Sequence, residues 1–291
     1  MKTAKVFLVS LFFITALSIF LYSQNHWISM DQYVVQSSNL PQNFDDFKIV
    51  HLSDLHGQSF GKNQSYLLKK IHTFKPDLIA ITGDLFDASS TIEASFNLIE
   101  QLTDYPVYFV TGNHESWRSD YVALEKQLAE LGVHILRNEH KIIEIGKQQI
   151  EIIGIDDPNF GDSVDNNLQV SLKESDPNSF KLLLSHRPET FEHYVEKEID
   201  LVLSGHAHGG QFRLPFINGI VAPDQGLFPT FTEGIHTKNK TTMIISRGLG
   251  NSIIPQRLFN RPNLIQIILK AGALGTRFLF NSVCVTTNLY T

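Results

Sequence analysis

Five short polar clusters, each directly after an apolar run, hold the residues of this 291-residue chain that could do chemistry. The clusters offer carboxylates, imidazoles and one amide, and no thiol. Such oxygen and nitrogen donors suit Mn, Zn or Fe ions, and catalytic sites of these metals keep positions open for water. The clusters therefore predict a metal centre. The candidate ligands are Asp54, His56, Asp84, Asn113, His186, His206 and His208.

The spacing within the clusters suits two ions rather than one. Asp54 and His56 are alternate residues that leave one predicted strand, so both can reach the same ion. Asp84 has two carboxylate oxygens and can bridge two ions. His206 and His208 are again alternate residues and can face different ions. Two ions that share a water lower its pKa, which provides a nucleophile near neutral pH.

A glycine stands directly before three of the ligands. Gly83, Gly112 and Gly205 are expected to let the backbone turn tightly beside the ions. Asn113, which follows Gly112, would offer its neutral amide oxygen to the second ion.

The first half of the sequence alternates apolar runs with amphipathic segments. This βαβαβ rhythm is typical of a largely parallel sheet. Because the carboxyl ends of parallel strands meet at one edge, the polar clusters should lie together there. The predicted strands are 47–53, 77–82 and 107–111, and the predicted helices are 64–74, 92–102 and 121–131.

The second half continues with strands of a different arrangement. A hairpin is predicted from 141–145 and 149–155 around Gly146-Lys147. The segment 211–231 is rich in Gly, Pro and Phe and is interpreted as a long ordered loop. Further strands are predicted at 33–35, 180–185, 201–204, 241–246 and 264–269.

The ordered set D-x-H, G-D-x-x-D, G-N-H-E, a later His and G-H-x-H resembles the calcineurin-like metallophosphoesterase superfamily. All five blocks occur in order between Asp54 and His208, and the stretch GHAHGGQFRLP resembles a membrane-anchored bacterial branch of phosphohydrolases. The resemblance implies a four-layer α/β/β/α sandwich. It also implies an enzyme that cleaves a phosphoester or pyrophosphate bond with two divalent ions (Mn, Zn or Fe) and metal-activated water.

The resemblance also implies a role for each residue. His114 would be the acid facing the leaving-group oxygen, and Asp87 would orient it, as carboxylates behind imidazoles do. Ala88 stands where the family often has an arginine, so a phosphate clamp from that position is absent. The first ion would be held by Asp54, His56, Asp84 and His208, and the second by Asp84, Asn113, His186 and His206.

The N-terminus carries 17 residues without a charge, 6–22, preceded by Lys2 and Lys5. As a helix this run spans about 25 Å, near the short end of a membrane span. It has no polar face, unlike a core helix, and Leu21-Tyr22-Ser23 makes a poor signal-peptidase site. We therefore expect a single-pass signal anchor with the N-terminus inside and the domain outside the cytoplasm; secretion after cleavage is the alternative.

Four segments are predicted along the chain. Residues 1–23 form the anchor, 24–46 a linker with the edge strand, 47–270 the metallophosphoesterase domain, and 271–291 a tail of unknown role. The single cysteine, Cys284, excludes an intramolecular disulfide, and the net charge of −6 argues against binding long nucleic acid.

Several classes of substrate agree with the sequence. The branch resembles UDP-2,3-diacylglucosamine pyrophosphatases, which suggests a nucleotide-linked or lipid-like phosphate; a cyclic-nucleotide or general phosphodiesterase, a nuclease, or a non-catalytic scaffold are the alternatives. Arg187, Arg213 and Arg247 could contact phosphate but are expected to be structural, and Glu115 could support the ligands or merely begin a helix. Four aromatic residues could either pack within the long loop or form an apolar wall beside the metal ions for an amphiphilic substrate. They are Phe212, Phe216, Phe228 and Phe231.

Overall fold

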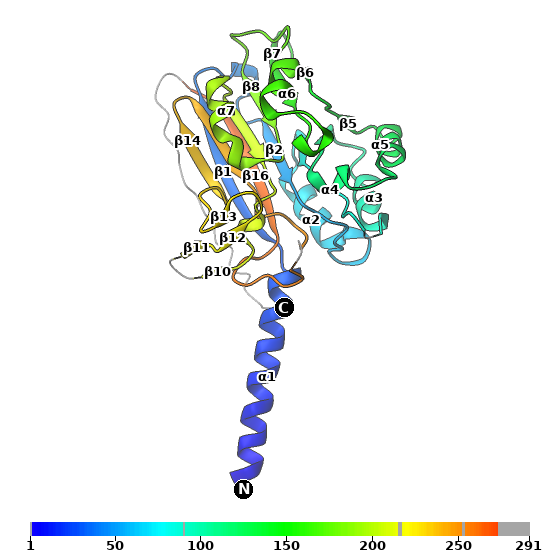
Figure 1. The fold of residues 1–291 in the computed structure, drawn as a ribbon, viewed down its shortest axis with the longest axis vertical. Helices are drawn as coiled ribbons and strands as arrows, with labels where there is room; N and C mark the ends of the chain where they lie inside the picture. The colour runs from blue at the N-terminus through cyan, green and yellow to red at the C-terminus, as the bar shows by residue number, and fades with distance from the viewer. Residues whose placement is uncertain (1, 90, 215–216, 252–253, 273–291) are drawn as a thin grey trace.

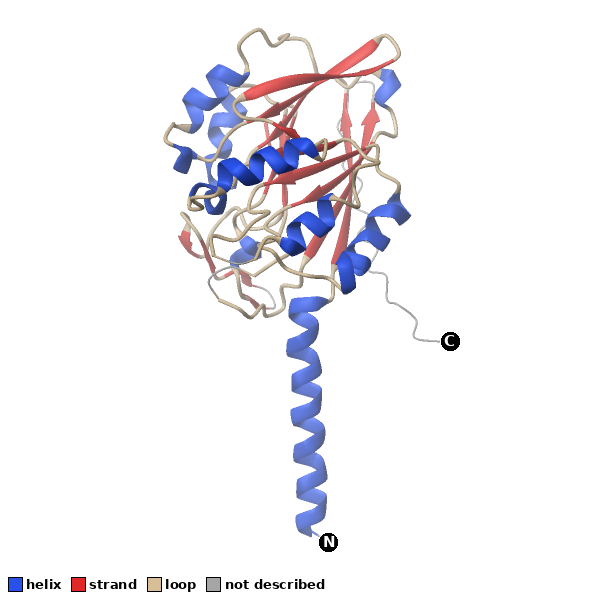
Figure 2. Cartoon of the chain, turned by 90° about the vertical axis from the view of Figure 1, so that its right-hand side faces the viewer, coloured by secondary structure: helices blue, strands red, loops and turns tan. Residues whose placement is uncertain are grey.

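Two six-stranded sheets stack face to face, helices cover the outer face of each, and one long helix projects from one end (Figures 1 and 2). This is the four-layer α/β/β/α sandwich that the family resemblance implies. The computed structural model describes residues 2–89, 91–214, 217–251 and 254–272.

The first sheet has the order β1-β16-β2-β3-β4-β5. Neighbouring strands run parallel except β16 and β2, which are antiparallel. The edge strand predicted at 33–35 is part of the longer β1. The bounds are β1 Ser29–Ser37, β2 Lys48–Leu52, β3 Leu78–Thr82, β4 Val107–Val110, β5 His134–Ile135 and β16 Asn263–Ala271.

The second sheet has the order β14-β15-β9-β8-β7-β6. Its four middle strands are parallel, and β14 and β6 close the edges as antiparallel hairpin partners. The hairpin predicted around Gly146 is β6–β7, whereas β14 was not predicted. The bounds are β6 Glu139–Ile145, β7 Gln148–Gly154, β8 Lys181–Leu184, β9 Leu201–Ser204, β14 Gly234–Lys238 and β15 Thr241–Ile245.

Helices α2, α3 and α5 cover the first sheet, and α6 and α7 cover the second. The three helices predicted from helical spacing are α2, α3 and α5; the shorter α4, α6 and α7 were not predicted. The helices are α1 Lys2–His26, α2 Ser65–Phe74, α3 Glu93–Ile99, α4 Asn113–Ser116, α5 Tyr121–Glu130, α6 Val164–Ser171 and α7 Phe191–Glu196. Single 3-10 turns are η1 Gln42–Phe44, η2 Lys62–Gln64, η3 Pro158–Phe160, η4 Pro188–Thr190 and η5 His208–Gly210.

The central strands are mostly apolar because both of their faces are buried. In β3, Ile79 and Ile81 pack under the helices of the first sheet. Leu78 and Ala80 point the other way, into the core between the two sheets. Sheets that are covered on both faces require such largely apolar strands. The ends of these strands, which carry the polar clusters, therefore lie inside the molecule.

The segment 211–231 is not the strand-free loop that its composition suggested. It contains two small hairpins, with β10 Arg213–Leu214 against β11 Ile217–Gly219 and β12 Val221–Ala222 against β13 Gly226–Leu227. Strands of two or three residues are too short to leave a period-two pattern in a sequence. The segment therefore has regular structure, and its turns can hold side chains in fixed places.

The N-terminal helix is longer than the apolar run and joins the domain without a linker. Among the described residues, α1 is the one helix long and apolar enough to cross a membrane. It continues to His26, where Ser23 and Gln24 are already buried, and only Trp27 and Ile28 separate it from β1. The stretch 24–46, predicted as a linker with an edge strand, contains the last turn of α1, the edge strand β1 and η1. The tail expected at 271–291 lies outside the described residues except for its first two.

One buried histidine in the first sheet makes the free energy of unfolding depend on pH. His51 in β2 is fully buried, with Nε2 2.8 Å from Thr82 Oγ1 and Nδ1 without a partner. Burial lowers its pKa to about 3. The unfolded chain takes up a proton near the ordinary histidine pKa while the folded chain does not, so the stability due to neutral His51 is complete above about pH 6.5. That stability is lost progressively as the pH falls from there toward 3.

We expect the metal-free chain in detergent to lose about 2 kcal/mol more unfolding free energy between pH 7.5 and 5.0 than its His51→Gln variant does. Urea unfolding at the two pH values measures the difference. Equal losses in both proteins would show that His51 is not the group responsible.

Candidate metal centre

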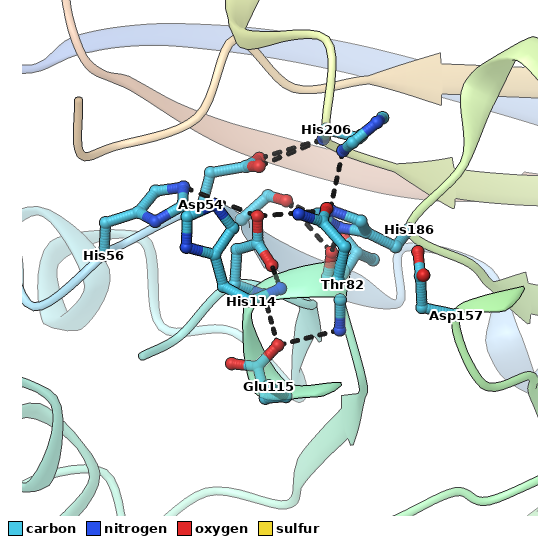
Figure 3. A network of polar contacts seen from close by, with 12 residues as sticks. Asp54, His56, Thr82, His114, Glu115, Asp157, His186 and His206 are labelled. Atoms are coloured by element: carbon cyan, nitrogen blue, oxygen red, sulfur yellow. Dashed lines mark hydrogen bonds and ion pairs between the residues drawn. The ribbon is translucent and has the colours of Figure 1, made fainter. Parts of the chain in front are cut away.

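The seven predicted ligands come together in one buried cluster where strands of both sheets end. Figure 3 shows four of them, Asp54, His56, His186 and His206. Asp54 and His56 follow β2, and Asp84 follows β3. His186 follows β8, and the remaining ligands follow β4 and β9 in the same way. All seven side chains belong to residues at most 8 % exposed. The sheet edge thus assembles donors that lie up to 154 positions apart in the sequence.

The first group is made of Asp54, His56, Asp84 and His208, whose donor atoms all lie within 4.8 Å of one another. His56 Nε2 is 3.3 Å from His208 Nε2 and 3.5 Å from Asp84 Oδ2. His208 Nε2 is 3.4 Å from Asp54 Oδ1. Four donors from three strand ends therefore face a common point.

The second group shares Asp84 with the first. His186 Nε2 lies 3.3 Å from Asp84 Oδ2, 3.1 Å from His206 Nδ1 and 3.1 Å from Asn113 Oδ1. The same oxygen, Asp84 Oδ2, thus contacts a histidine of each group. This is the arrangement expected of a carboxylate between two ions.

These separations suit metal binding. Two donors that each lie about 2.0–2.2 Å from one ion stand roughly 3.0–3.5 Å apart in tetrahedral or octahedral coordination. Imidazole nitrogens that face one another at such distances are held by a proton or a metal ion between their lone pairs. The buried His/Asp cluster therefore fits a dinuclear divalent metal site.

Hydrogen bonds on the outer ring nitrogens orient the imidazoles. His186 Nδ1 donates to the Thr82 carbonyl oxygen at 2.7 Å, which leaves the Nε2 lone pair for a ligand bond. His206 Nε2 is 3.0 Å from Asp224 Oδ2, which likewise leaves Nδ1 directed into the cluster. Second partners of this kind fix both the tautomer and the ring orientation of metal-binding histidines.

The backbone at the ligands is held in an unusual conformation. Five of the seven ligands have φ between 47° and 63°, in the left-handed region that residues with a Cβ seldom occupy. Such strain persists only where the surroundings enforce it, and it is typical of functional sites. The five are Asp54, His56, Asp84, His206 and His208.

The three glycines beside the ligands serve two different purposes. Gly83 has φ of 84° and makes the expected tight turn. Gly112 is extended, and Gly205 is likewise outside the left-handed region. They are needed for space instead, because a Cβ at Gly205 would lie 1.8 Å from Ser53 Oγ and one at Gly112 would lie 2.3 Å from Asp84 Oδ1.

Burial and mutual charge set the protonation of the cluster. Burial opposes ionisation of Asp84, but His186 and His56 outweigh it and hold the Asp84 pKa well below its usual value. Against its own burial, His186 has its pKa raised to about 10 by Asp84. Burial lowers the pKa of His206 to about 4. Burial, together with His56, also holds the pKa of His208 well below its usual value. A histidine must lose its proton before it can bind a metal ion. Metal binding to this cluster must therefore release the proton of His186.

Asp87 lies behind His114, as the resemblance implied, and it also lies behind His56. Its Oδ1 is 3.1 Å from His114 Nδ1 and 3.4 Å from His56 Nδ1. The backbone N–H of Ala88 also points at His114 Nδ1, at 3.2 Å. With Nδ1 engaged, Nε2 is the nitrogen of His114 that is left for a substrate.

Glu115, whose role the sequence left open, supports the ligands from beneath (Figure 3). It is fully buried, and its Oε2 accepts hydrogen bonds from the backbone N–H of Asp84 at 2.9 Å and of Gly112 at 2.8 Å. Its Oε1 accepts from Phe86 N at 3.0 Å. Burial and Asp84 raise its pKa to about 7, against the three N–H donors. Glu115 thus ties the ends of β3 and β4 together where two ligands begin.

Replacing Glu115 by glutamine should weaken metal binding 10- to 100-fold, the usual loss when a partner behind the ligands is removed. The amide nitrogen would face a backbone N–H and separate the two strand ends. Competition with a fluorescent chelator measures the affinity, and Glu130→Gln on the exposed surface of α5 is the matched control. Unchanged affinity in Glu115→Gln would show that Asp84 and Asn113 are held by other means.

An ion-pair network that the sequence did not predict flanks His206; its Arg187 and Asp157 are buried and its Asp224 is exposed. Arg187 Nε is 2.5 Å from Asp157 Oδ2, and Nη2 is 2.9 Å from Asp157 Oδ1. Arg187 Nη1 pairs with Asp224 and lies 2.9 Å from His206 Nε2. Asp157 could have been found, because it follows the end of β7 as the ligands follow theirs. Asp224 could not, since its turn between β12 and β13 left no sequence signal.

The other two arginines considered from the sequence are structural. Arg213 pairs with Glu233, and Arg247 pairs with Glu233 at 2.6 Å and with Asp31 at 3.3 Å. Neither lines the pocket at the cluster.

A pocket of about 460 Å³ opens at the cluster. Trp117 forms part of its wall, with its ring 4.6 Å from that of His114. None of the described phenylalanines of segment 211–231 lines it, so no apolar Phe wall stands beside the ligands, and Phe216 is outside the described residues. The lining residues are Asp84, Asn113, His114, Trp117, Pro158, Asn159, Arg187, Glu189, His206, His208, Pro223 and Asp224.

Comparisons with known proteins agree with this geometry. The chain is similar to the uncharacterized metallophosphoesterase YkuE of Bacillus subtilis, with 29% identity over 257 residues, 86% of this chain and 88% of the relative. It is 32% identical to the uncharacterized metallophosphoesterase YkoQ of Bacillus subtilis over 222 residues, 74% of this chain and 81% of the relative. It is 30% identical to the phosphodiesterase YaeI of Escherichia coli over 234 residues, 77% of this chain and 82% of the relative.

The sequence profile of the calcineurin-like phosphoesterases matches residues 47–210, more than half of the chain, and this stretch contains all seven clustered ligands. The chain therefore belongs to the calcineurin-like phosphoesterase family and is a phosphoester hydrolase.

Proposed function

We propose that the chain is a membrane-anchored, two-metal phosphohydrolase that cleaves a phosphodiester or pyrophosphate bond. The observation that carries this proposal is the pair of buried donor groups that share Asp84 Oδ2 and open into one pocket. Asp54, His56, Asp84 and His208 would hold one ion, and Asp84, Asn113, His186 and His206 the other.

The ions, when bound, would supply Lewis acidity toward the phosphoryl oxygens and a water of lowered pKa as nucleophile. Residues of the chain itself would supply and orient the proton donor. His114 lines the pocket and is not a member of either donor group, so it can face the leaving-group oxygen and donate a proton to it. Asp87, 3.1 Å from His114 Nδ1, would hold the ring so that Nε2 points at that oxygen.

The charges around the pocket favour a diester over a monoester. Arg187 is the one arginine among the described lining residues, and its guanidinium is already paired with Asp157 and Asp224. Ala88 stands where relatives often supply another arginine. A monoester dianion would bring extra negative charge beside Asp224 and Glu189, and no lysine or arginine among the described lining residues is free to meet it. A diester carries a single charge.

The substrate class follows only by analogy with relatives. A nucleotide-linked or lipid-like pyrophosphate, of the UDP-2,3-diacylglucosamine type, is the first candidate. A cyclic-nucleotide or general phosphodiesterase or nuclease activity is the second, and the name of the Escherichia coli relative, a phosphodiesterase, favours it. A scaffold without activity is the third.

A substrate panel on the full chain in detergent, with Mn or Zn added, separates these candidates. Bis-p-nitrophenyl phosphate should be hydrolysed faster than p-nitrophenyl phosphate, and UDP-linked lipids and cyclic nucleotides should show which natural class is preferred. Excess chelator should stop all hydrolysis. Faster cleavage of the monoester would contradict the diester preference, and no hydrolysis of any substrate would favour the scaffold.

The N-terminal helix fits a membrane anchor, and we propose that it spans the membrane once with the domain outside the cytoplasm. Lys2 and Lys5 precede the span, which favours an N-terminus inside. The burial of Ser23 and Gln24 against the domain supports an uncleaved helix. Alkaline phosphatase fused after Thr291 should be active, and a fusion active only in the cytoplasm would reverse the orientation.

A further inference from the structure

The last turn of α1 is fastened to the domain by side-chain and backbone contacts. Asn25 Nδ2 donates to the Pro255 carbonyl at 2.8 Å, and Arg257 N donates to Asn25 Oδ1 at 2.8 Å. The ring of Phe20 packs 5.3 Å from that of Phe259. A helix held this way cannot swivel freely, so the domain meets the plane of a membrane with one particular face.

That face must lie close to the lipid. The charge-free run ends at Tyr22, and Ser23 is already buried by the domain. The headgroup layer on each side of a bilayer is roughly 5–8 Å thick, and a helix rises about 1.5 Å per residue. With the apolar run of α1 in the hydrocarbon, the domain surface around its end falls within the headgroup layer.

Exposed apolar side chains are found on this face beside the helix. Trp27 is 52 % exposed and Phe259 53 % exposed, although both are large apolar residues. The guanidinium of Arg261 lies 5.9 Å from the Trp27 ring. Tryptophan and arginine are the residues that membrane proteins place at the lipid–water interface.

The hairpins of segment 211–231 extend the same apolar surface. Figure 1 shows β10 to β13 at the end of the domain from which α1 leaves. There Leu227 and Phe228 are 71 % and 70 % exposed, and Val221 on the paired strand is partly exposed. Elsewhere in the described domain, exposed large apolar residues stand singly on separate elements, as Val122 does on α5 and Val170 on α6.

We propose that these side chains form a docking surface that rests on the headgroup layer of the bilayer in which α1 is anchored. The docking surface consists of Trp27, Phe259, Leu214, Val221, Leu227 and Phe228, all of them exposed large apolar residues, with Leu214 on β10 40 % exposed. A bilayer is the occupant because the surface continues α1 itself, through the contact of Phe20 with Phe259. The inference rests on the proposed membrane anchorage and not on the identity of the substrate.

Docking would also place the pocket at the membrane. The turn between β12 and β13 supplies Pro223 and Asp224 to the pocket wall, while Leu227 on the same hairpin faces outward. One side of this hairpin would therefore touch lipid and the other the reacting phosphate. The site would meet phosphates that are presented at the height of lipid headgroups.

Spin labels on the full chain in phosphatidylcholine–phosphatidylglycerol vesicles test the docking surface. The natural thiol is removed with Cys284→Ser, and single labels are attached after Leu227→Cys and Val221→Cys. Val122→Cys and Val170→Cys, on α5 and α6, are the matched exposed controls. Electron paramagnetic resonance compares collisions with oxygen, which concentrates in lipid, and with chromium oxalate, which stays in water.

Labels at 227 and 221 should collide more with oxygen and less with chromium oxalate than the labels at 122 and 170. Equal accessibility at all four positions would overturn the proposal. So would spin–spin coupling between labels at 227, because it would show that a second copy of the chain covers the surface. Hydrolysis of bis-p-nitrophenyl phosphate by the same samples tests the proposed function separately, since that soluble substrate needs no docking.

Discussion

Asp84→Ala should abolish hydrolysis and remove both ions, because Asp84 is the residue that the two donor groups share. Its Oδ2 is 3.5 Å from His56 Nε2 and 3.3 Å from His186 Nε2. Its Oδ1 accepts the backbone N–H of His114 at 2.9 Å, so the loss would also release the proposed acid. Metal ions contribute several kcal/mol to such reactions, which corresponds to a loss of roughly 10³-fold or more in rate.

Elemental analysis of the purified chain, together with hydrolysis of bis-p-nitrophenyl phosphate, measures both effects. Asp104→Ala, which removes an exposed carboxylate, should keep both ions and full activity. An Asp84→Ala protein that still held two ions per chain would contradict the bridging role.

His114→Ala should lower turnover by about 10²- to 10⁴-fold while the metal content stays the same. His114 contributes no atom to either of the two donor groups, but it lines the pocket beside them. The loss should grow as the leaving group becomes poorer, since a poor leaving group depends more on a donated proton. A purely structural role would lower the rate equally for all leaving groups.

The rates are compared for a series of diesters whose leaving groups differ in basicity, with the exposed His72→Ala as control. A loss independent of the leaving group would remove His114 from proton transfer. Loss of an ion in His114→Ala would instead show that His114 is a metal ligand, since its ring lies close to donor atoms of His56 and Asp87.

The sequence pattern predicted a largely parallel sheet and the ligand cluster because both depend on local patterns, whereas the four-layer sandwich was implied by the family resemblance. An apolar strand buried on both faces must be a continuous apolar run, as in β3 and β9. A ligand such as Asp84 or His206 stands two residues past the end of its strand. Once the strands form a parallel sheet, these donors have to meet, and no long-range information is needed.

The features that the sequence did not reveal depend on contacts between distant segments. Glu115 is an ordinary first-turn acid until the fold brings the N–H groups of Asp84 and Phe86 against it. The pairing of Arg187 with Asp224 likewise requires the β12–β13 hairpin, whose strands are too short to be recognised. The absence of a linker after α1 was also missed, because the helix continues past its apolar run through polar residues that only the domain surface buries.

The central claim is that one cluster holds two ions and that hydrolysis needs both. Titration of the metal-free full chain with Mn²⁺, followed by the rate of bis-p-nitrophenyl phosphate hydrolysis, tests it most directly. The rate should rise from near zero and level off at two equivalents per chain. A full rate in excess chelator, or a plateau at one equivalent, would contradict it.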